Sequence, residues 1–169
     1  RLAALLPELV ALRRDLHAHP ELGFQERRTA AIAADWLRAL PRIRVRTGVA
    51  GTGVIATLDG SREGPCLALR ADMDALPMDD TCGRPHASRH PGATHACGHD
   101  GNVACLLGAA RFLAADAAEG RLRGTVRFIF QPAEEGGGGA RPMIEQGALD
   151  DPAPAAIFAL HAWPQLPLG

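Results

Sequence analysis

Residues 66–74, CLALRADMD, decide the fold class of this 169-residue chain. The run CLALR is short and largely apolar and follows the turn residues Gly64 and Pro65, which predicts a short buried strand. Asp72 and Asp74 come directly after it. In open α/β sheets, ligands bind at the carboxyl ends of the strands. The stretch therefore predicts a strand that delivers carboxylates to a site at the edge of a sheet.

Two further strands are predicted to deliver polar residues in the same way. The apolar residues of 126–131 indicate a strand that leads to Glu134 and Glu135. Those of 155–160 indicate a last buried strand that leads to His161. If the three strands are neighbours, their carboxylates and imidazole meet at one edge.

Helices are predicted between these strands, and the alternation favours an α/β sheet with an at least partly parallel core. Asn102 is expected to cap a helix whose apolar stripe runs from Val103 to Leu113. The other predicted elements are helices at 2–16 (closed by Pro20), 30–40 (closed by Pro41) and 143–146, and strands that begin at Ile43 and Val54.

Composition excludes several classes of function. Hydrophobic residues make up 47% and charged residues 22%, which supports a packed core and argues against disorder. A balance of 18 basic and 19 acidic residues provides no field for nucleic acid or an anionic membrane. The chain contains no apolar run long enough to span a bilayer, and its first residues lack the pattern of a signal peptide, so we expect a cytoplasmic protein.

Histidine and cysteine concentrate in the long segment between the first of these strands and the helix after it. Its run HACGHD at 95–100 opens that helix, and the helix dipole is expected to favour a thiolate at Cys97. Gly98, which has no side chain, places little steric restriction on the turn between Cys97 and His99. Cys66 and Cys105 are expected to be buried, whereas Cys82 has no assigned role. The histidines of this segment are His86, His90, His95 and His99.

Thiolate, imidazole and carboxylate together favour a transition-metal site, with zinc as the default and manganese, cobalt or nickel as alternatives. In the pair Glu134-Glu135, one carboxylate can bind metal while its neighbour accepts a proton from water. Each feature also has a structural explanation, since surface Glu pairs are usually solvated and a single histidine such as His161 is more often a hydrogen-bonded core residue. Together at one edge, they favour the metal site.

Two other features are expected to be structural or supporting. His17 and His19 lie at a helix end, where an imidazole can satisfy free backbone carbonyls. The glycines of 136–139 are expected to let the backbone approach a substrate, and no G-K-S/T motif follows that would make them a nucleotide-binding loop.

Five blocks of the sequence resemble the metal-dependent aminoacylase and carboxypeptidase (zinc peptidase) family, in family order and over nearly the whole chain. Within that family they are most similar to the hippurate hydrolase and indole-acetyl-amino-acid hydrolase subfamily. The blocks are LRRDLHAHPELGFQE (12–26), LRADMDALP (69–77), ASRHPGATHACGHDGN (87–102), FQPAEEGGGGA (130–140) and LHAWP (160–164).

The resemblance implies a three-layer α/β catalytic domain with a mixed, mostly parallel sheet flanked by helices. It implies a hydrolase that uses two divalent metal ions to cleave N-acyl amino acids, hippurate-like or aminoacylase-like, into a carboxylic acid and a free amino acid. By motif, Cys97 would bridge the two ions, His99 and His161 would ligate one and Glu135 the other. Glu134 would be the general base.

Two further aspartates receive roles from the resemblance. Asp74 matches the family aspartate that orients a ligand. Asp72 stands where relatives outside the subfamily carry a histidine ligand, which makes it a weak metal candidate only.

The sequence departs from the family at two points. Asn102 replaces the histidine usual in CGHDxH. The family is also about twice this length, so residues 1–169 are expected to be the N-terminal segment of the catalytic domain, without the lid and dimerisation domain and without the C-terminal catalytic segment. A homodimer or higher homo-oligomer is expected to form through that lid.

Three alternatives stay open at this point. The nearest is a metallo-aminopeptidase or carboxypeptidase. Another is a non-catalytic metal-binding domain derived from such an enzyme. The least favoured is a cysteine-nucleophile hydrolase that uses Cys97 and His99, because nucleophile and base usually come from different parts of a fold.

Overall fold

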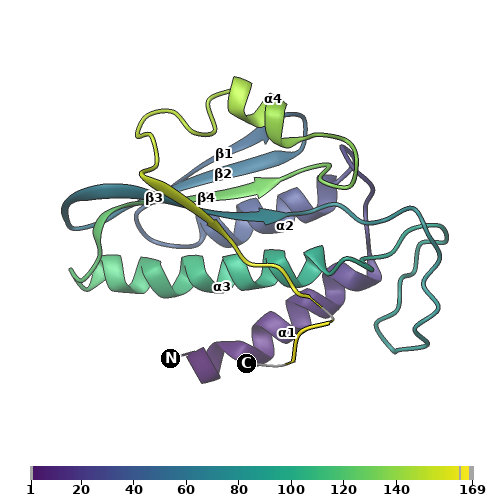
Figure 1. The fold of residues 1–169 in the computed structure, drawn as a ribbon. Helices are drawn as coiled ribbons and strands as arrows, with labels where there is room; N and C mark the ends of the chain where they lie inside the picture. Colours follow the sequence, from purple (N-terminus) through teal and green to yellow (C-terminus); the bar gives the residue numbers. More distant parts are fainter. Residues whose placement is uncertain (1, 164, 168–169) are drawn as a thin grey trace.

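A five-stranded mixed sheet, in the order β1-β2-β4-β3-β5, forms the centre of the computed structural model, which describes residues 2–163 and 165–167 (Figure 1). Pro164, the last residue of the LHAWP block, therefore lies outside the described residues. In chain order the elements are α1 (Leu2–Ala18), α2 (Arg27–Arg38), β1 (Ile43–Val49), β2 (Gly53–Asp59), β3 (Arg62–Asp72), α3 (His99–Ala118), β4 (Arg123–Gln131), α4 (Ala140–Glu145) and β5 (Ala156–Ala159).

Strand direction divides the sheet into two parts. Strand β3 pairs parallel with β4 and with β5, whereas β1 pairs antiparallel with β2 and β2 antiparallel with β4. The mixed sheet is thus confirmed, but parallel pairing is confined to β3, β4 and β5. The turn between β1 and β2 is too short for the crossover that a parallel pair requires, so these strands form a hairpin.

The layers follow from the alternation of side chains along the strands. On one face, apolar residues of β2 and β4 such as Val54 and Phe128 pack against α2 and α3, and α1 packs on α3. On the other face, Ile55 and Ile129 pack against Met143 of α4. The three layers expected for the family are therefore present, with α4 as a short outer layer (Figure 1).

Strand β5 differs from its prediction as a buried strand. Ile157 is 53% exposed and Phe158 is 58% exposed. Because consecutive side chains of a strand point to opposite faces, these two residues lie on the two faces of the sheet. Both faces of β5 are thus uncovered in the described part of the chain, because the strand lies at the sheet edge and is paired only with β3.

The start of α3 also differs from its prediction. The helix begins at His99 after Gly98, which has a φ of 87°, a left-handed conformation that favours glycine. Asn102 is therefore in the first turn instead of at the cap. Cys105 is exposed, contrary to expectation, because it lies on the opposite side of α3 from Val103, whereas Cys66 is buried as expected.

Among the described residues, none of the helices combines the length and apolar character that crossing a bilayer requires.

We expect Phe128→Ala to lower the free energy of unfolding by about 3–5 kcal/mol, because this fully buried ring fills the centre of the main core. Urea denaturation of the full-length protein measures the loss. Phe112→Ala on the partly exposed side of α3 is the matched control, with an expected loss of about 1 kcal/mol or less. Equal losses would contradict the assignment of the core.

Candidate metal centre

Parallel pairing brings the ends of β3 and β4 to the same edge of the sheet. Asp72 at the end of β3 is the register partner of Gln131 at the end of β4. The N–H of Met73 donates to the backbone oxygen of Gln131 at 3.0 Å, which continues the pairing beyond the strands. The acidic residues that follow each strand are therefore delivered to one place, as the sequence predicts.

Asp74 connects the two strand ends through its carboxylate. Its Oδ1 accepts the backbone N–H of Glu134 at 3.0 Å, and its Oδ2 accepts that of Glu135 at 2.9 Å. Burial acts to raise the pKa of Asp74, but the hydrogen bonds from His99 and from these two N–H groups outweigh it and lower the pKa below its ordinary value. Asp74 is thus a buried anion that fixes the Glu134-Glu135 backbone.

His99, the first residue of α3, is fully buried against the same carboxylates. Its Nδ1–H donates to the backbone oxygen of Asp74 at 2.8 Å, which leaves the Nε2 lone pair free. Nε2 lies 3.6 Å from Asp72 Oδ2 and 3.8 Å from both Glu134 Oε2 and Glu135 Oε1. Burial lowers the pKa of His99, but the hydrogen bond and the charges of Asp72 and Asp74 outweigh it, so the pKa is raised.

Two ligand atoms at this point are buried without a hydrogen-bond partner among the described residues. They are His99 Nε2 and Glu135 Oε1, and they face each other at 3.8 Å. A buried polar atom without a hydrogen-bond partner lowers the stability of the fold by about 1–3 kcal/mol. Two such atoms side by side are therefore rare unless a further group binds them. An imidazole nitrogen and a carboxylate oxygen are both good ligands for a divalent transition metal, and these residues therefore fit a metal ion.

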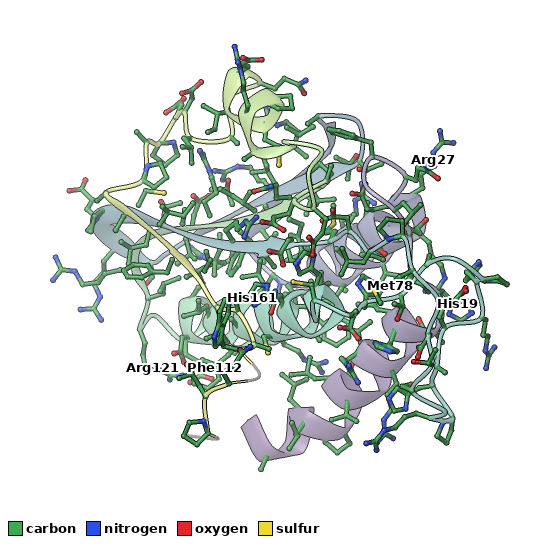
Figure 2. All side chains as sticks on the ribbon, turned by 45° about the vertical axis from the view of Figure 1, so that its right-hand side comes forward. His19, Arg27, Met78, Phe112, Arg121 and His161 are labelled. Carbon is green, nitrogen blue, oxygen red and sulfur yellow. The ribbon has the colours of Figure 1, made fainter. Side chains whose placement is uncertain are left out.

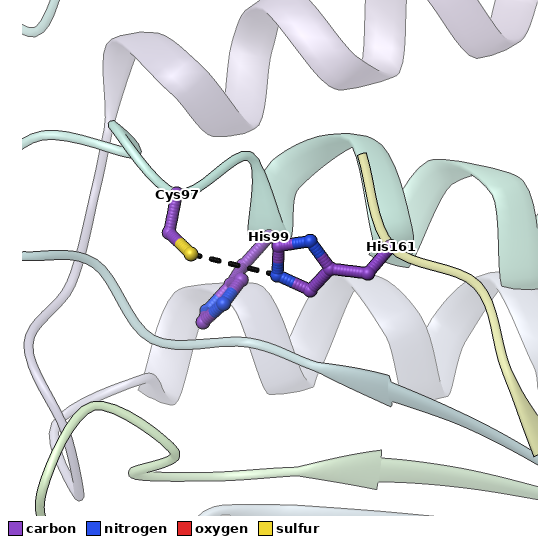
Figure 3. A group of neighbouring side chains, drawn as sticks. All are labelled: Cys97, His99 and His161. Atoms are coloured by element: carbon purple, nitrogen blue, oxygen red, sulfur yellow. Dashed lines mark hydrogen bonds between the residues drawn. The ribbon is translucent and has the colours of Figure 1, made fainter. Parts of the chain in front are cut away.

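Cys97, two residues before His99, and His161, which follows β5, complete the group (Figure 3). Cys97 Sγ lies 3.4 Å from His161 Nε2, and the rings of His99 and His161 are perpendicular with centroids 5.5 Å apart. The ligand atoms of the three residues all lie within 4.8 Å of one another. His161 follows β5 and is exposed, so it is not a core histidine (Figure 2).

The Cys97 thiol is not a free thiolate, contrary to the expectation from the helix dipole. Burial, a hydrogen bond to the Glu135 carboxylate and the negative charges of Glu135 and Glu134 raise the pKa of Cys97 to about 12. A dipole at one helix end is the weaker effect beside two carboxylates. The protonated thiol also argues against a cysteine nucleophile.

Asp72 is beside the site, but its oxygens already have donors. Arg70 contacts Asp72 Oδ2 at 2.9 Å, and the side-chain amide of Asn102 donates to Asp72 Oδ1 at 2.7 Å. Asn102 thus supports the buried Asp72 carboxylate. Because an ionised carboxylate only accepts hydrogen bonds, the NH₂ group of Asn102 is the donor in this contact.

The other histidines of the 86–99 segment do not join His99. His86 and His95 lie near His17, with ring centroids 5.6 and 6.4 Å from it, and His90 lies 5.8 Å from His19. His95 is buried, and this burial lowers its pKa to about 4, which keeps the ring neutral. Proximity in sequence therefore predicted too many histidines beside His99, because the segment runs past the end of α1 before it reaches α3.

The expectation for the two histidines at the end of α1 is half correct. His19 Nδ1 lies 2.9 Å from the backbone oxygen of Asp15, as expected of a residue that satisfies a free carbonyl. His17 instead contacts the carboxylate of Asp100 at 2.7 Å. This pairing could not be predicted from local spacing, since 83 residues separate the two.

The glycines of 136–139 are explained in part by the packing of the chain on itself. A Cβ on Gly139 would lie 1.9 Å from the backbone oxygen of Pro132, and one on Gly137 would lie 2.6 Å from the Cβ of Ala133. These two positions thus allow the loop to fold back on Pro132 and Ala133. Approach to a substrate is not required to explain them.

Glu26 supports the site, although its residue type and spacing did not predict this role. It is fully buried; its Oε1 accepts the backbone N–H of Ala133 at 2.8 Å, and its other oxygen accepts the hydroxyl of Thr52. Ala133 immediately precedes Glu134 and has a φ of 49°, a conformation uncommon for alanine. The only available signal was that Glu26 ends the first block of the family resemblance.

The sequence pattern described as Peptidase family M20/M25/M40 matches residues 68–169, which carry all of the candidate ligands. The chain belongs to peptidase family M20/M25/M40. The N-acetylcysteine deacetylase of Bacillus subtilis is 47% identical over 161 residues, which are 95% of this chain and 41% of that protein. The Arabidopsis thaliana IAA-amino acid hydrolase ILR1-like 4 is 45% identical over 95% of this chain and 35% of its own length.

Solved structures agree with this family membership. The Bacillus subtilis YXEP protein, described as a dinuclear metal binding peptidase of the M20 family, is 46% identical with a TM-score of 0.89. The match covers 98% of this chain and 45% of that one. The family resemblance is confirmed, and this M20/M25/M40 chain spans less than half the length of the relatives it matches.

We expect Glu26→Ala to lower the free energy of unfolding by about 1–3 kcal/mol, because the buried N–H of Ala133 loses its acceptor. Urea denaturation measures the change. Glu63→Ala removes an exposed carboxylate from β3 and should change stability by about 0.5 kcal/mol or less. Similar effects of the two substitutions would show that the Glu26 contact is unimportant.

We expect metal binding to release a proton from Cys97, because a pKa of about 12 keeps the thiol protonated at pH 8 whereas a metal binds the thiolate. Affinity should therefore fall as pH falls, since protons compete with the ion. Zinc titration with a pH indicator should detect about one proton fewer from Cys97→Ala than from the parent protein. Cys105→Ala is the control, and equal release from all three proteins would exclude Cys97 as a ligand.

Proposed function

We propose that the full-length protein is a metal-dependent amidohydrolase that cleaves the amide bond of N-acyl amino acids. The observation that carries the proposal is the pair of buried, unpartnered ligand atoms, His99 Nε2 and Glu135 Oε1, beside Cys97, His161 and the partly exposed Glu134. The names of the relatives, an N-acetylcysteine deacetylase and an IAA-amino acid hydrolase, support this substrate class. Hippurate is a further substrate to test.

Four residues would hold two divalent ions, with zinc, manganese, cobalt or nickel as the candidates. Cys97, His99, His161 and Glu135 would hold these ions. When bound, such ions polarise an amide carbonyl and acidify water. The donor set of thiolate, imidazole and carboxylate supports these metals over calcium or magnesium, which prefer oxygen ligands alone.

Glu134 would move the proton. Its carboxylate is held at the site by the backbone bond to Asp74, and 41% of its side chain is exposed, which leaves it open to water and substrate. It would take a proton from the water that adds to the amide carbon and pass it to the nitrogen of the leaving amine as the C–N bond breaks. The products are a carboxylic acid and a free amino acid.

Residues 1–169 would form the N-terminal segment of a larger catalytic domain. The greater length of the relatives supports this, as do the uncovered apolar side chains of β5, which need a partner surface. A lid and dimerisation domain and a C-terminal catalytic segment would supply that surface, the remaining metal ligand and a homo-oligomeric interface. Cytoplasmic location stays a prediction from the sequence.

Glu134→Gln in the metal-loaded full-length protein should lower kcat on N-acetyl amino acids and N-benzoylglycine by about 10²- to 10⁴-fold, because the amide cannot accept the proton. Metal content should be unchanged. Glu145→Gln, an exposed carboxylate of α4, is the control and should retain full activity.

The same assay separates the alternatives. Hydrolysis confined to peptides with a free N-terminus would identify a peptidase. Failure of the metal-loaded protein to cleave any of these substrates would favour a non-catalytic metal-binding domain. Full activity of Glu134→Gln would exclude Glu134 as the base.

A further inference from the structure

A second group of metal-ligating side chains lies outside the candidate metal centre. It consists of His17 at the end of α1 and of Asp80 and Cys82 in the segment between β3 and α3. His17 and Cys82 line a cavity of about 650 Å³ between α1, that segment and the first turns of α3. In Figure 1 the segment can be followed past the end of α1.

The three side chains are close enough to share one ion. His17 Nε2 lies 3.4 Å from Asp80 Oδ2, and the nearest ligand atoms of all three residues lie within 4.8 Å of one another. The side chains of His17 and Asp80 are only 10% and 6% exposed, whereas Cys82 is exposed. The group is thus anchored on its buried side and open on the other, which gives an ion a path of entry.

The hydrogen bond on the far side of the imidazole prepares His17 as a ligand. Its Nδ1 lies 2.7 Å from the carboxylate oxygen Asp100 Oδ2, so Nδ1–H donates and the lone pair is on Nε2, which faces Asp80. Metal-binding histidines almost always donate their other N–H to a carboxylate or carbonyl in this way. Asp100 is therefore a positioning residue for His17.

Asp80 is also held in position as an anion. Its Oδ1 accepts the backbone N–H of Cys82 and its Oδ2 that of Ser88, both at 2.8 Å. These two bonds and one from the Cys82 thiol lower the pKa of Asp80 well below its ordinary value. Each carboxylate oxygen retains a lone pair that can bind an ion.

The charges around the group restrict the ion. Arg13 contacts Asp100 at 2.8 Å, and its positive charge offsets the negative charge of Asp100. Arg13, Arg14 and Arg84 all line the cavity. Calcium and magnesium depend on many oxygen ligands and are disfavoured here, because Asp80 is the one carboxylate among the three grouped side chains. Zinc forms strong bonds to thiolate and imidazole.

We propose that His17, Asp80 and Cys82 form a binding site for one zinc-like divalent ion, separate from the candidate metal centre. The site would use three protein ligands and one open position. It would join the segment between β3 and α3 to the end of α1.

Alkylation of individual cysteines tests this proposal in the full-length protein. Iodoacetamide labelling is measured by peptide mass spectrometry with and without zinc. We expect zinc to slow the labelling of Cys82 at least tenfold and to leave Cys105 unchanged. Cys105 is the matched control because it is exposed in the same cavity but outside the group. In Asp80→Asn, protection of Cys82 should be lost while protection of Cys97 persists.

The outcomes separate this site from the candidate metal centre and from unspecific binding. Equal labelling of Cys82 with and without zinc would overturn the proposal and leave the function of the Cys97 site untouched. Protection of Cys105, or protection of Cys82 that persists in Asp80→Asn, would also overturn it, because zinc would then bind thiols without the three-residue site. Protection of Cys97 in Asp80→Asn shows that the variant is folded.

Discussion

The carboxylate of Asp74 holds the candidate metal centre together. It is almost fully buried, yet it stays ionised because it accepts the backbone N–H groups of Glu134 and Glu135 and contacts His99. The end of β3, the loop after β4 and the start of α3 are therefore tied to one side chain.

Concentrated negative charge is the cost of this arrangement. Asp72, Asp74, Glu134 and Glu135 meet around one imidazole. Burial and the charges of Glu135, Glu134 and Asp72 raise the pKa of Cys97. The hydrogen bond to Asp74 and the charges of Asp72 and Asp74 raise the pKa of His99 against the effect of burial. Repulsion among buried or half-buried carboxylates is unfavourable in the absence of a cation. The same charges would favour divalent ions, so metal binding at this site would displace the proton of the Cys97 thiol.

Much of the fold and most of the candidate site could be predicted from the sequence. The strands that lead to Asp72 and Asp74 and to Glu134 and Glu135 were predicted, because a buried strand needs a continuous apolar run whatever its neighbours are. The start of β3 at Arg62 was missed, since Gly64 and Pro65, predicted as a turn, lie within the strand beside an irregularity in its pairing. The exposure of β5 could not be predicted, since its composition is that of a core strand and burial depends on what covers it. The role of Glu26 was equally hidden, because its partners lie 26 and 107 residues away along the chain.

The sequence by itself determined which side chains could ligate a metal, which strands lead to them and which family the chain resembles, because these follow from residue type and local spacing. Only the tertiary structure decided that His99, not the neighbouring His95, faces the carboxylates, and that His17 faces Asp80 and Cys82 instead of a backbone carbonyl. The reason is physical. A ligand set is a property of distances between segments, and those distances are fixed by the pairing of β3 with β4 and by the packing of α1 on α3.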